Sequence, residues 1–146
     1  MQNNIGLLCK TARREAGISQ EAAAERLYIS ITTLAAIERG DREPQPAIIG
    51  RMTDLYCKPM LALQYVRACA AEVGPGILPD VEERPLALSV MQLVNRIYAF
   101  ADAHKDRALM QIAEDGVIDD AERPEYDSIV SDLGDIIRAA LELRCH

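Results

Sequence analysis

The sequence has little of what metal sites, disulfide frameworks and aromatic cores require. It contains no Trp, one Phe and five Tyr, and only two histidines, His104 and His146. The four cysteines are widely spaced and form no CxxC pair: Cys9, Cys57, Cys69 and Cys145. Because a zinc site needs clustered Cys or His ligands, we expect no metal site, and we interpret the cysteines as reduced residues of the core.

Motifs for catalysis and for membrane insertion are also missing. The chain has no phosphate-binding loop, no GxGxxG motif and no pairing of a nucleophile with a base, so we expect neither an enzyme nor a cofactor. No apolar run approaches the roughly 20 residues that span a bilayer, and the N-terminus shows no signal-peptide pattern. We therefore expect a cytoplasmic protein without a membrane partner.

What the sequence does contain favours helices. Apolar residues make up 49% of the chain, and Ala, Leu, Ile, Glu and Arg dominate, while runs typical of β-strands are missing. The predicted fold class is therefore all-α. The net charge of −7 is unevenly divided, because residues 1–74 carry nine Lys/Arg and eight Asp/Glu (+1), whereas residues 75–146 carry seven and fifteen (−8). The first half can still gather its positive charges on one face.

A stretch rich in proline and glycine divides the chain. The segment EVGPGILPDVEERP, residues 72–85, contains three prolines and two glycines together with an acidic run, which is typical of a linker. We therefore predict an N-terminal domain at 1–73, a linker at 74–85 and an acidic helical C-terminal domain at 86–146.

Five helices are predicted in the N-terminal domain from apolar spacing and from capping residues. Ser19 and Ser30 are good N-caps, Gly17 and Gly40 suit the position after a helix, and Pro46 suits a first turn. The helices are expected from about Asn4 to Ala16, Ser19 to Leu27, Ser30 to Gly40, Pro46 through Tyr56, and from Pro59 onward, the last with Leu61, Tyr65, Val66 and Cys69 packed.

The C-terminal domain is predicted to hold three helices, at Leu86 to Ala103, Lys105 to Glu114 and about Asp120 to Leu143. The first is apolar over so broad a face that another part of the structure must cover it. Asp119 or Asp120, with Glu122, suits the N-terminus of the last. This last helix has a heptad stripe that fits an intramolecular core and a dimer seam equally well: Tyr126, Ile129, Leu133, Ile136, Ala140 and Leu143.

Residues 5–57 resemble the helix-turn-helix of Cro/CI-type repressors, the XRE family. The resemblance rests on RREAGISQEAAAERL, beginning at Arg13, and on Ser30, Leu34, Ile37, the ERG of residues 38–40 and Pro44. It implies a five-helix bundle whose third helix reads the major groove, usually in a dimer on a two-fold site. It also implies that Arg13 and Glu38 form a partly buried ion pair between the first and third helices.

The third helix supplies the candidate base contacts. Leu34 and Ile37 are three residues apart and should face the core, which leaves the opposite face for DNA: Ser30, Ile31, Thr32, Thr33 and Ala36. Gln20 opens the second helix, where backbone N–H groups favour a phosphate. The basic candidates for phosphate contacts are Lys10, Arg14, Arg39 and Arg42.

Two positions depart from the family. Tyr28 stands in the turn between the second and third helices, where the family usually has glycine and φ is often positive. The exposed face of the third helix has no Arg, Gln or Asn, the residues that read guanine and adenine with paired hydrogen bonds. Direct readout should therefore be modest, and specificity should depend on DNA shape, on Gln20 or on half-site spacing.

These features favour a DNA-binding transcriptional regulator, a dimeric repressor of phage or bacterial type whose partner is double-stranded DNA. The alternative is a protein-interaction module, an antirepressor or regulatory partner, in which the repressor-like bundle docks a protein. Two features favour that alternative: the exposed face of the third helix has no Arg, Gln or Asn, and the second half of the chain has a net charge of −8. The acidic C-terminal half would accordingly form the dimer or bind a protein partner.

Overall fold

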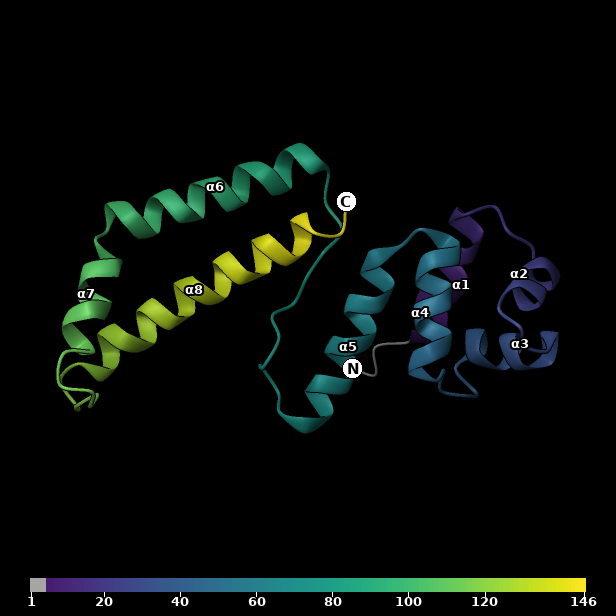
Figure 1. Cartoon of the computed structure of the whole chain (residues 1–146), viewed down its shortest axis with the longest axis horizontal. Coiled ribbons are helices and arrows are strands. Elements are labelled where there is room, and N and C mark those ends of the chain that lie inside the picture. The colour runs from purple at the N-terminus through teal and green to yellow at the C-terminus, as the bar shows by residue number, and fades with distance from the viewer. Residues whose placement is uncertain (1–4) are drawn as a thin grey trace. The chain divides into compact units, whose positions relative to one another are not determined.

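The structure, a computed structural model, describes residues 5–146, and those residues form eight helices and no strand (Figure 1). This confirms the predicted all-α class. Asn4, the expected first residue of the first helix, lies outside the described residues. The chain divides into two compact units between Leu78 and Pro79. None of the helices in the described part of the chain is long and apolar enough to cross a membrane.

The N-terminal unit contains five helices whose boundaries follow the local chemistry of the sequence. They are α1 (Ile5–Glu15), α2 (Gln20–Arg26), α3 (Ile31–Arg39), α4 (Pro46–Tyr56) and α5 (Pro59–Val73). Gly17 and Gly40 take positive φ angles of 68° and 81° after α1 and α3, which a residue with a side chain adopts only with strain. Proline occupies the first turn of α4 and of α5, where its missing N–H costs no helical hydrogen bond.

The core of the N-terminal unit lies between α1 and the helices packed against it, α3, α4 and α5. Its largest fully buried members are Leu27, Leu34, Ile37 and Met52. Ala23 and Ala24 are buried on α2, and their small side chains allow this short helix to approach its neighbours closely. Tyr65 of α5 donates a hydrogen bond from its hydroxyl to the carbonyl of Pro44 at 3.3 Å, which anchors the loop between α3 and α4.

Two expectations about packing in this unit are wrong. Cys57 and Cys69 are exposed rather than buried, and Val66 of α5 is 53% exposed. Cys57 follows α4 in a left-handed conformation with φ 52°, so it lies at the helix end and not on the packed face. Of the four cysteines, Cys9 fits the prediction of a core residue, since it is completely buried.

The C-terminal unit is a helical hairpin closed by a short helix. It contains α6 (Leu86–Asp102), α7 (Lys105–Ile112) and α8 (Arg123–Leu143). α6 and α8 pack along each other, and α7 contacts both where α6 ends (Figure 1). Arg96 of α6 binds Asp135 of α8 at 2.6 Å, and Lys105 binds Asp132.

The predicted start of the last helix is early by three residues, because α8 begins at Arg123 and not at Asp120. Residues 119–122 instead form a turn in which Asp119 and Glu122 bond each other reciprocally. The Glu122 N–H donates to Oδ1 of Asp119 at 2.8 Å, and the Asp119 N–H donates to Oε2 of Glu122 at 3.3 Å. Such a reciprocal pair normally caps a helix start, and here it closes the turn just before α8.

Residues 81–84, which were predicted to belong to a linker, pack on the C-terminal unit. Val81 is buried, and the Glu82 N–H donates to the buried carboxylate of Glu142 at 3.2 Å. Arg84 lies 3.3 Å from the same carboxylate. In α8, Ile129 is fully buried whereas Leu133 and the other members of the heptad stripe are half-buried. The stripe therefore contributes to the core of this unit without being covered completely by it.

Candidate nucleic-acid interface

α2, the turn after it and α3 are each positioned by local hydrogen bonds. Ser19 accepts a hydrogen bond from the Ala22 N–H at 3.2 Å, and Ser30 accepts one from the Thr33 N–H at 3.1 Å. Each serine thereby pairs one of the N–H groups left unbonded at a helix start. The second N-cap lies directly in front of the predicted reading helix, so it also sets where the exposed side chains of α3 begin.

Tyr28 occupies the turn between α2 and α3 in a left-handed conformation. Its φ is 56°, and its side chain is 85% exposed. The Tyr28 N–H donates to the Glu25 carbonyl at 3.1 Å, and the Ile29 N–H donates to the Ala24 carbonyl at 3.1 Å. The turn thus keeps the positive φ that the family's usual glycine allows, and a bulky residue bears the strain.

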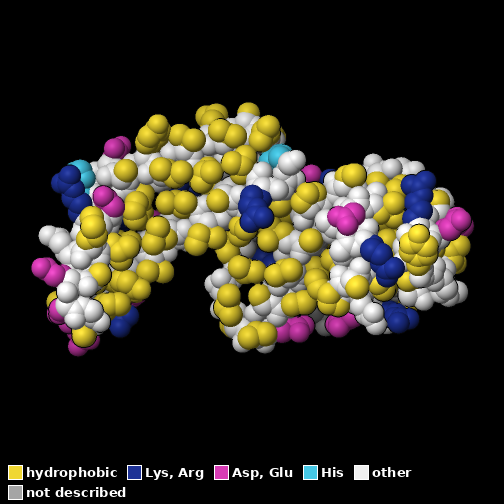
Figure 2. Space-filling view, in the orientation of Figure 1, with side chains coloured by type: hydrophobic (Ala, Val, Ile, Leu, Met, Phe, Trp, Pro, Cys, Tyr) yellow, Lys and Arg dark blue, Asp and Glu magenta, His cyan; other side chains and the backbone are white. Residues whose placement is uncertain are grey.

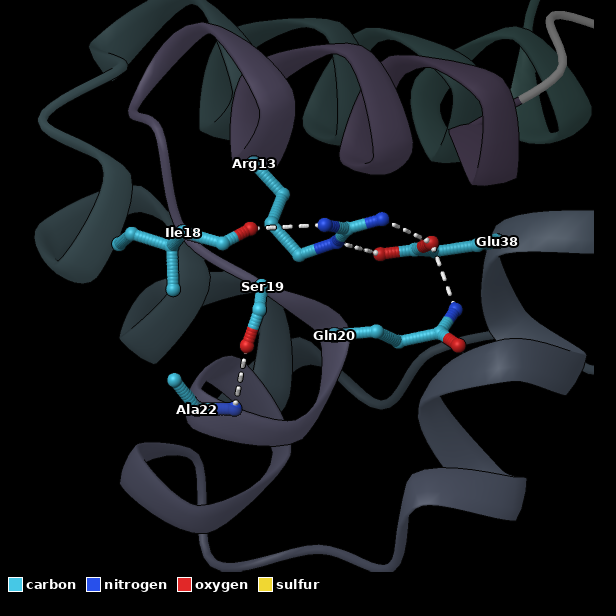
Figure 3. A network of polar contacts seen from close by, with 6 residues as sticks. All are labelled: Arg13, Ile18, Ser19, Gln20, Ala22 and Glu38. Atoms are coloured by element: carbon cyan, nitrogen blue, oxygen red, sulfur yellow. Dashed lines mark hydrogen bonds and ion pairs between the residues drawn. The ribbon is translucent and has the colours of Figure 1, made fainter.

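Arg13, Gln20 and Glu38 form one hydrogen-bonded network that joins α1, α2 and α3 (Figure 3). Arg13 donates through Nε to Oε1 of Glu38 at 2.6 Å and through Nη2 to Oε2 at 3.0 Å. Its third donor, Nη1, bonds the Ile18 carbonyl at 2.7 Å. Gln20 donates from Nε2 to Oε2 of Glu38 at 3.0 Å. The resemblance implied the ion pair, and the structure adds Gln20 to it.

The surroundings of Glu38 are apolar on the core side. Burial raises the pKa of the Cys9 thiol to about 12, and the negative charge of Glu38 adds to this shift. Burial, followed by the same charge, also raises the pKa of Tyr56. Hydrogen bonding to Glu38 raises the pKa of Arg13, against a smaller opposing effect of burial. A carboxylate buried in this way needs its hydrogen-bond donors, so Arg13 and Gln20 hold α3 in one orientation.

The outward face of α3 carries hydroxyl and methyl groups. Leu34 and Ile37 have no exposed surface, whereas Thr32 is exposed, Ile31 is 42% exposed, and Thr33 and Ala36 are half-buried. This arrangement agrees with the two faces predicted from spacing. Thr32 is exposed and Ala36 keeps part of its surface accessible, so this side of α3 is available to a ligand.

The three hydroxyls at the start of α3 are bonded to one another. Oγ of Ser30 lies 2.9 Å from Oγ1 of Thr32 and also 2.9 Å from Oγ1 of Thr33. Because Ser30 already caps the helix through its lone pairs, it has little capacity left for a base. Thr32, the more exposed of the two threonines, is therefore the hydroxyl best placed to meet a base edge.

The basic candidates for phosphate contacts differ in exposure and in pairing. Arg14 and Arg42 are exposed and Lys10 is half-buried. Figure 2 shows Lys and Arg side chains on the end of this unit formed by α1, α2 and α3. Arg39, however, is bound through Nε to Oδ2 of Asp41 at 2.7 Å. Both side chains are about 60% exposed, at 61% and 59%, so this ion pair is weak and open to competition by a phosphate.

Two features of this surface were not predicted from the sequence. Arg26, in the last turn of α2, is a further exposed basic residue beside the turn. Asp41 pairs with Arg39 and partly neutralises its charge. In the sequence, nothing marks Asp41 for this role except its position one residue after Gly40. Among residues 5–146, no group of three or more His, Cys, Asp and Glu side chains is arranged to hold a metal ion.

The N-terminal unit matches a known protein family. Residues 5–59 match the family model described as a helix-turn-helix domain. No significant match was found among curated proteins or among solved structures. This part of the chain is therefore similar to a helix-turn-helix domain, and that similarity supports a DNA-binding regulator in general.

Proposed function

We propose that the protein is a dimeric transcriptional repressor of the Cro/CI (XRE) type, of phage or bacterial origin. In this proposal it acts in the cytoplasm, without catalysis or cofactor, and inserts α3 into the major groove. The observation that carries the proposal is the outward face of α3. Thr32 and Ile31 are exposed there, and the same helix is held in place through its buried Glu38, which Arg13 and Gln20 bind.

Contacts to bases are expected to be few. The threonine hydroxyls accept from or donate to several bases, and the methyl groups of Ile31, Thr32 and Ala36 fit a thymine methyl. Neither kind of group makes the paired hydrogen bonds that distinguish guanine or adenine strongly. Sequence preference should therefore arise largely from DNA shape and from the spacing of two half-sites.

Gln20 offers an amide for direct readout or for a phosphate contact. Its Nε2 uses one hydrogen to bond Glu38, which leaves the second hydrogen and the amide oxygen for a ligand. Since Glu38 is itself fixed by Arg13, Gln20 is oriented before DNA arrives. This preorganisation lowers the entropy cost of any contact that Gln20 makes.

Phosphate contacts are expected to supply most of the affinity. Lys10, Arg14, Arg39 and Arg42 are the candidates, and each phosphate neutralised should contribute about 0.9 to the slope of log K against log salt. Binding should therefore weaken steeply as salt increases, although the chain as a whole has a net charge of −7.

Selection of bound fragments from random DNA, with the full chain, tests the proposal. We expect an enriched sequence with two-fold symmetry, and an affinity for it that falls with salt. Thr32→Val keeps the shape of the side chain and removes its hydroxyl, so it should change the preferred sequence more than the overall affinity. Failure to enrich any sequence, together with binding that ignores salt, would contradict the proposal.

The second candidate function is a protein-interaction module. It is favoured by the outward face of α3, which presents hydroxyls and methyls and no Arg, Gln or Asn. In that case DNA affinity should be weak and equal for all sequences, and Thr32→Val should leave it unchanged. The same selection experiment therefore separates the two functions.

A further inference from the structure

The outer face of α6 is a continuous apolar surface with nothing covering it in the C-terminal unit. Six large side chains on it are between 40% and 63% exposed: Leu86, Val90, Met91, Val94, Ile97 and Tyr98. They recur at steps of three, four and one along the helix, so they share one side of it. Figure 2 shows hydrophobic side chains along the length of α6. Ser89, on the side that packs inward, is completely buried.

This face carries no charge. Among the 17 residues of α6 only Arg96 and Asp102 are charged. Arg96 points to α8, where it binds Asp135 at 2.6 Å, and Asp102 is the last residue of the helix. A helix whose outer side faces water is normally polar there, so this helix is built to be covered.

We propose that a second copy of this chain covers it, with the two α6 helices packed antiparallel about Val94. The proposal rests on the dimer in the proposed function and names the surface that forms it. Its test is made without DNA, so its failure is distinguishable from a failure to bind DNA.

The apolar area is large enough for a specific dimer. At about 150–200 Å² for a fully exposed side chain of this size, the six residues present on the order of 500 Å² of apolar surface. Two such faces would bury about 1,000 Å², which is the lower bound for a specific interface. Patches of this size on a monomer usually mark an interaction site.

The distribution of acidic residues selects the antiparallel arrangement. Seven Asp and Glu residues lie between Glu114 and Asp127, with Arg123 the only basic residue among them. They lie at the closed end of the hairpin, where α7 leads into α8 (Figure 2). Parallel helices would bring the two acidic ends together. Antiparallel helices keep them about 25 Å apart, the length of α6, which exceeds the Debye length of about 8 Å.

Val94 lies at the centre of the apolar face of α6. It lies midway between Leu86 and Asp102, the first and last residues of α6. In a two-fold antiparallel pair the central residue meets its own copy, and Val90 meets Tyr98 of the second copy. In a parallel pair every residue would meet its own copy, so cross-linking distinguishes the two arrangements.

The first experiment measures self-association of the full chain by sedimentation, with Val94→Glu compared with Val117→Glu. Val117 is 64% exposed in the turn before α8, so the second variant makes the same change away from α6. We expect the native chain and Val117→Glu to dimerise, and Val94→Glu to dimerise at least tenfold more weakly, with unchanged helix content by circular dichroism. A native chain that stays monomeric at all accessible concentrations, or an equal effect of both variants, overturns the proposal.

The second experiment determines the orientation by disulfide cross-linking. Cys57, Cys69 and Cys145 are first replaced by Ser, which leaves Cys9 in the core. Val94→Cys should then cross-link two chains readily on oxidation, whereas Leu86→Cys should not, because its two copies would lie about 24 Å apart. Equal cross-linking of both variants indicates parallel helices and overturns the antiparallel arrangement.

Discussion

Arg13 and Glu38 meet through two parallel hydrogen bonds, 2.6 and 3.0 Å long, across the interface between α1 and α3. The Glu38 side chain is 2% exposed and that of Arg13 is 10% exposed. A buried ion pair of this kind contributes little net stability, because removing both charges from water offsets their attraction. Its main effect is on geometry, since α3 cannot rotate without leaving a buried carboxylate unpaired.

Removing one partner of this pair should be far more harmful than removing both. Arg13→Met leaves Glu38 buried with Gln20 as its remaining side-chain donor, so the free energy of unfolding should fall by about 3 kcal/mol. Adding Glu38→Leu should recover most of that loss, because no charge is then buried. Chemical denaturation of the two single variants and the double variant measures this. A double variant as unstable as Arg13→Met would show that the arginine acts through packing alone.

The pair between Arg39 and Asp41 leads to a prediction for DNA binding. Asp41→Asn removes a negative charge 2.7 Å from Arg39 and frees the guanidinium, so affinity for any DNA should rise severalfold. Arg39→Ala should lower affinity equally for all sequences and reduce the salt slope by about 1. Arg107→Ala, an equal loss of charge at an exposed position on α7, is the matched control and should change neither. Filter binding or fluorescence anisotropy at two salt concentrations measures these effects.

Local chemistry predicted the helix-turn-helix well. Ser19 and Ser30 cap their helices, and Leu34 and Ile37 face the core, because hydrogen bonding to the nearest N–H groups and the period of the helix act over a few residues. Thr32 was placed outward by the same period. These features needed no knowledge of the tertiary fold.

Features that depend on distant partners were not predictable in this way. The buried Glu142 carboxylate accepts from the Glu82 N–H and pairs with Arg84, some 60 residues earlier in the chain, where local composition indicated a linker. Cys69 lies four residues after Tyr65, which packs against the core, but it is itself exposed because the core cluster does not extend to it. The bond between Gln20 and Glu38 likewise joins residues 18 apart.

The strained turn at Tyr28 predicts a stabilising substitution. Tyr28→Gly removes the steric cost of φ 56°, and it sacrifices little packing because the side chain is 85% exposed, so the free energy of unfolding should rise by about 1 kcal/mol. Tyr28→Ala keeps a Cβ in the same conformation and should give no gain, and Tyr28→Asn should lie between them. Urea denaturation of the three variants measures the order. If Ala stabilises as much as Gly, the removed aromatic ring and not the backbone was the source of the cost.

Cys9 and Tyr56 predict a loss of stability at alkaline pH. Burial raises the pKa of Cys9 from 9.0 to about 12 and raises that of Tyr56 above its ordinary value. Between the ordinary pKa and the raised pKa of each group, the unfolded chain loses a proton that the folded chain retains. The free energy of unfolding therefore decreases as pH rises above about 9. Each group contributes at most about 1.4 kcal/mol per pH unit.

Denaturant unfolding at about pH 7 and about pH 10 measures this loss of stability. The loss should be absent below the pKa values of the unfolded chain and should grow as the pH rises past them. Cys9→Ala and Tyr56→Phe each remove one titrating group, so each should reduce the loss of stability between the two pH values. Cys57→Ala removes an exposed thiol at the end of α4 and is the matched control. If Cys9→Ala and Cys57→Ala both show the pH dependence of the native chain, the buried thiol is not a source of the alkaline loss.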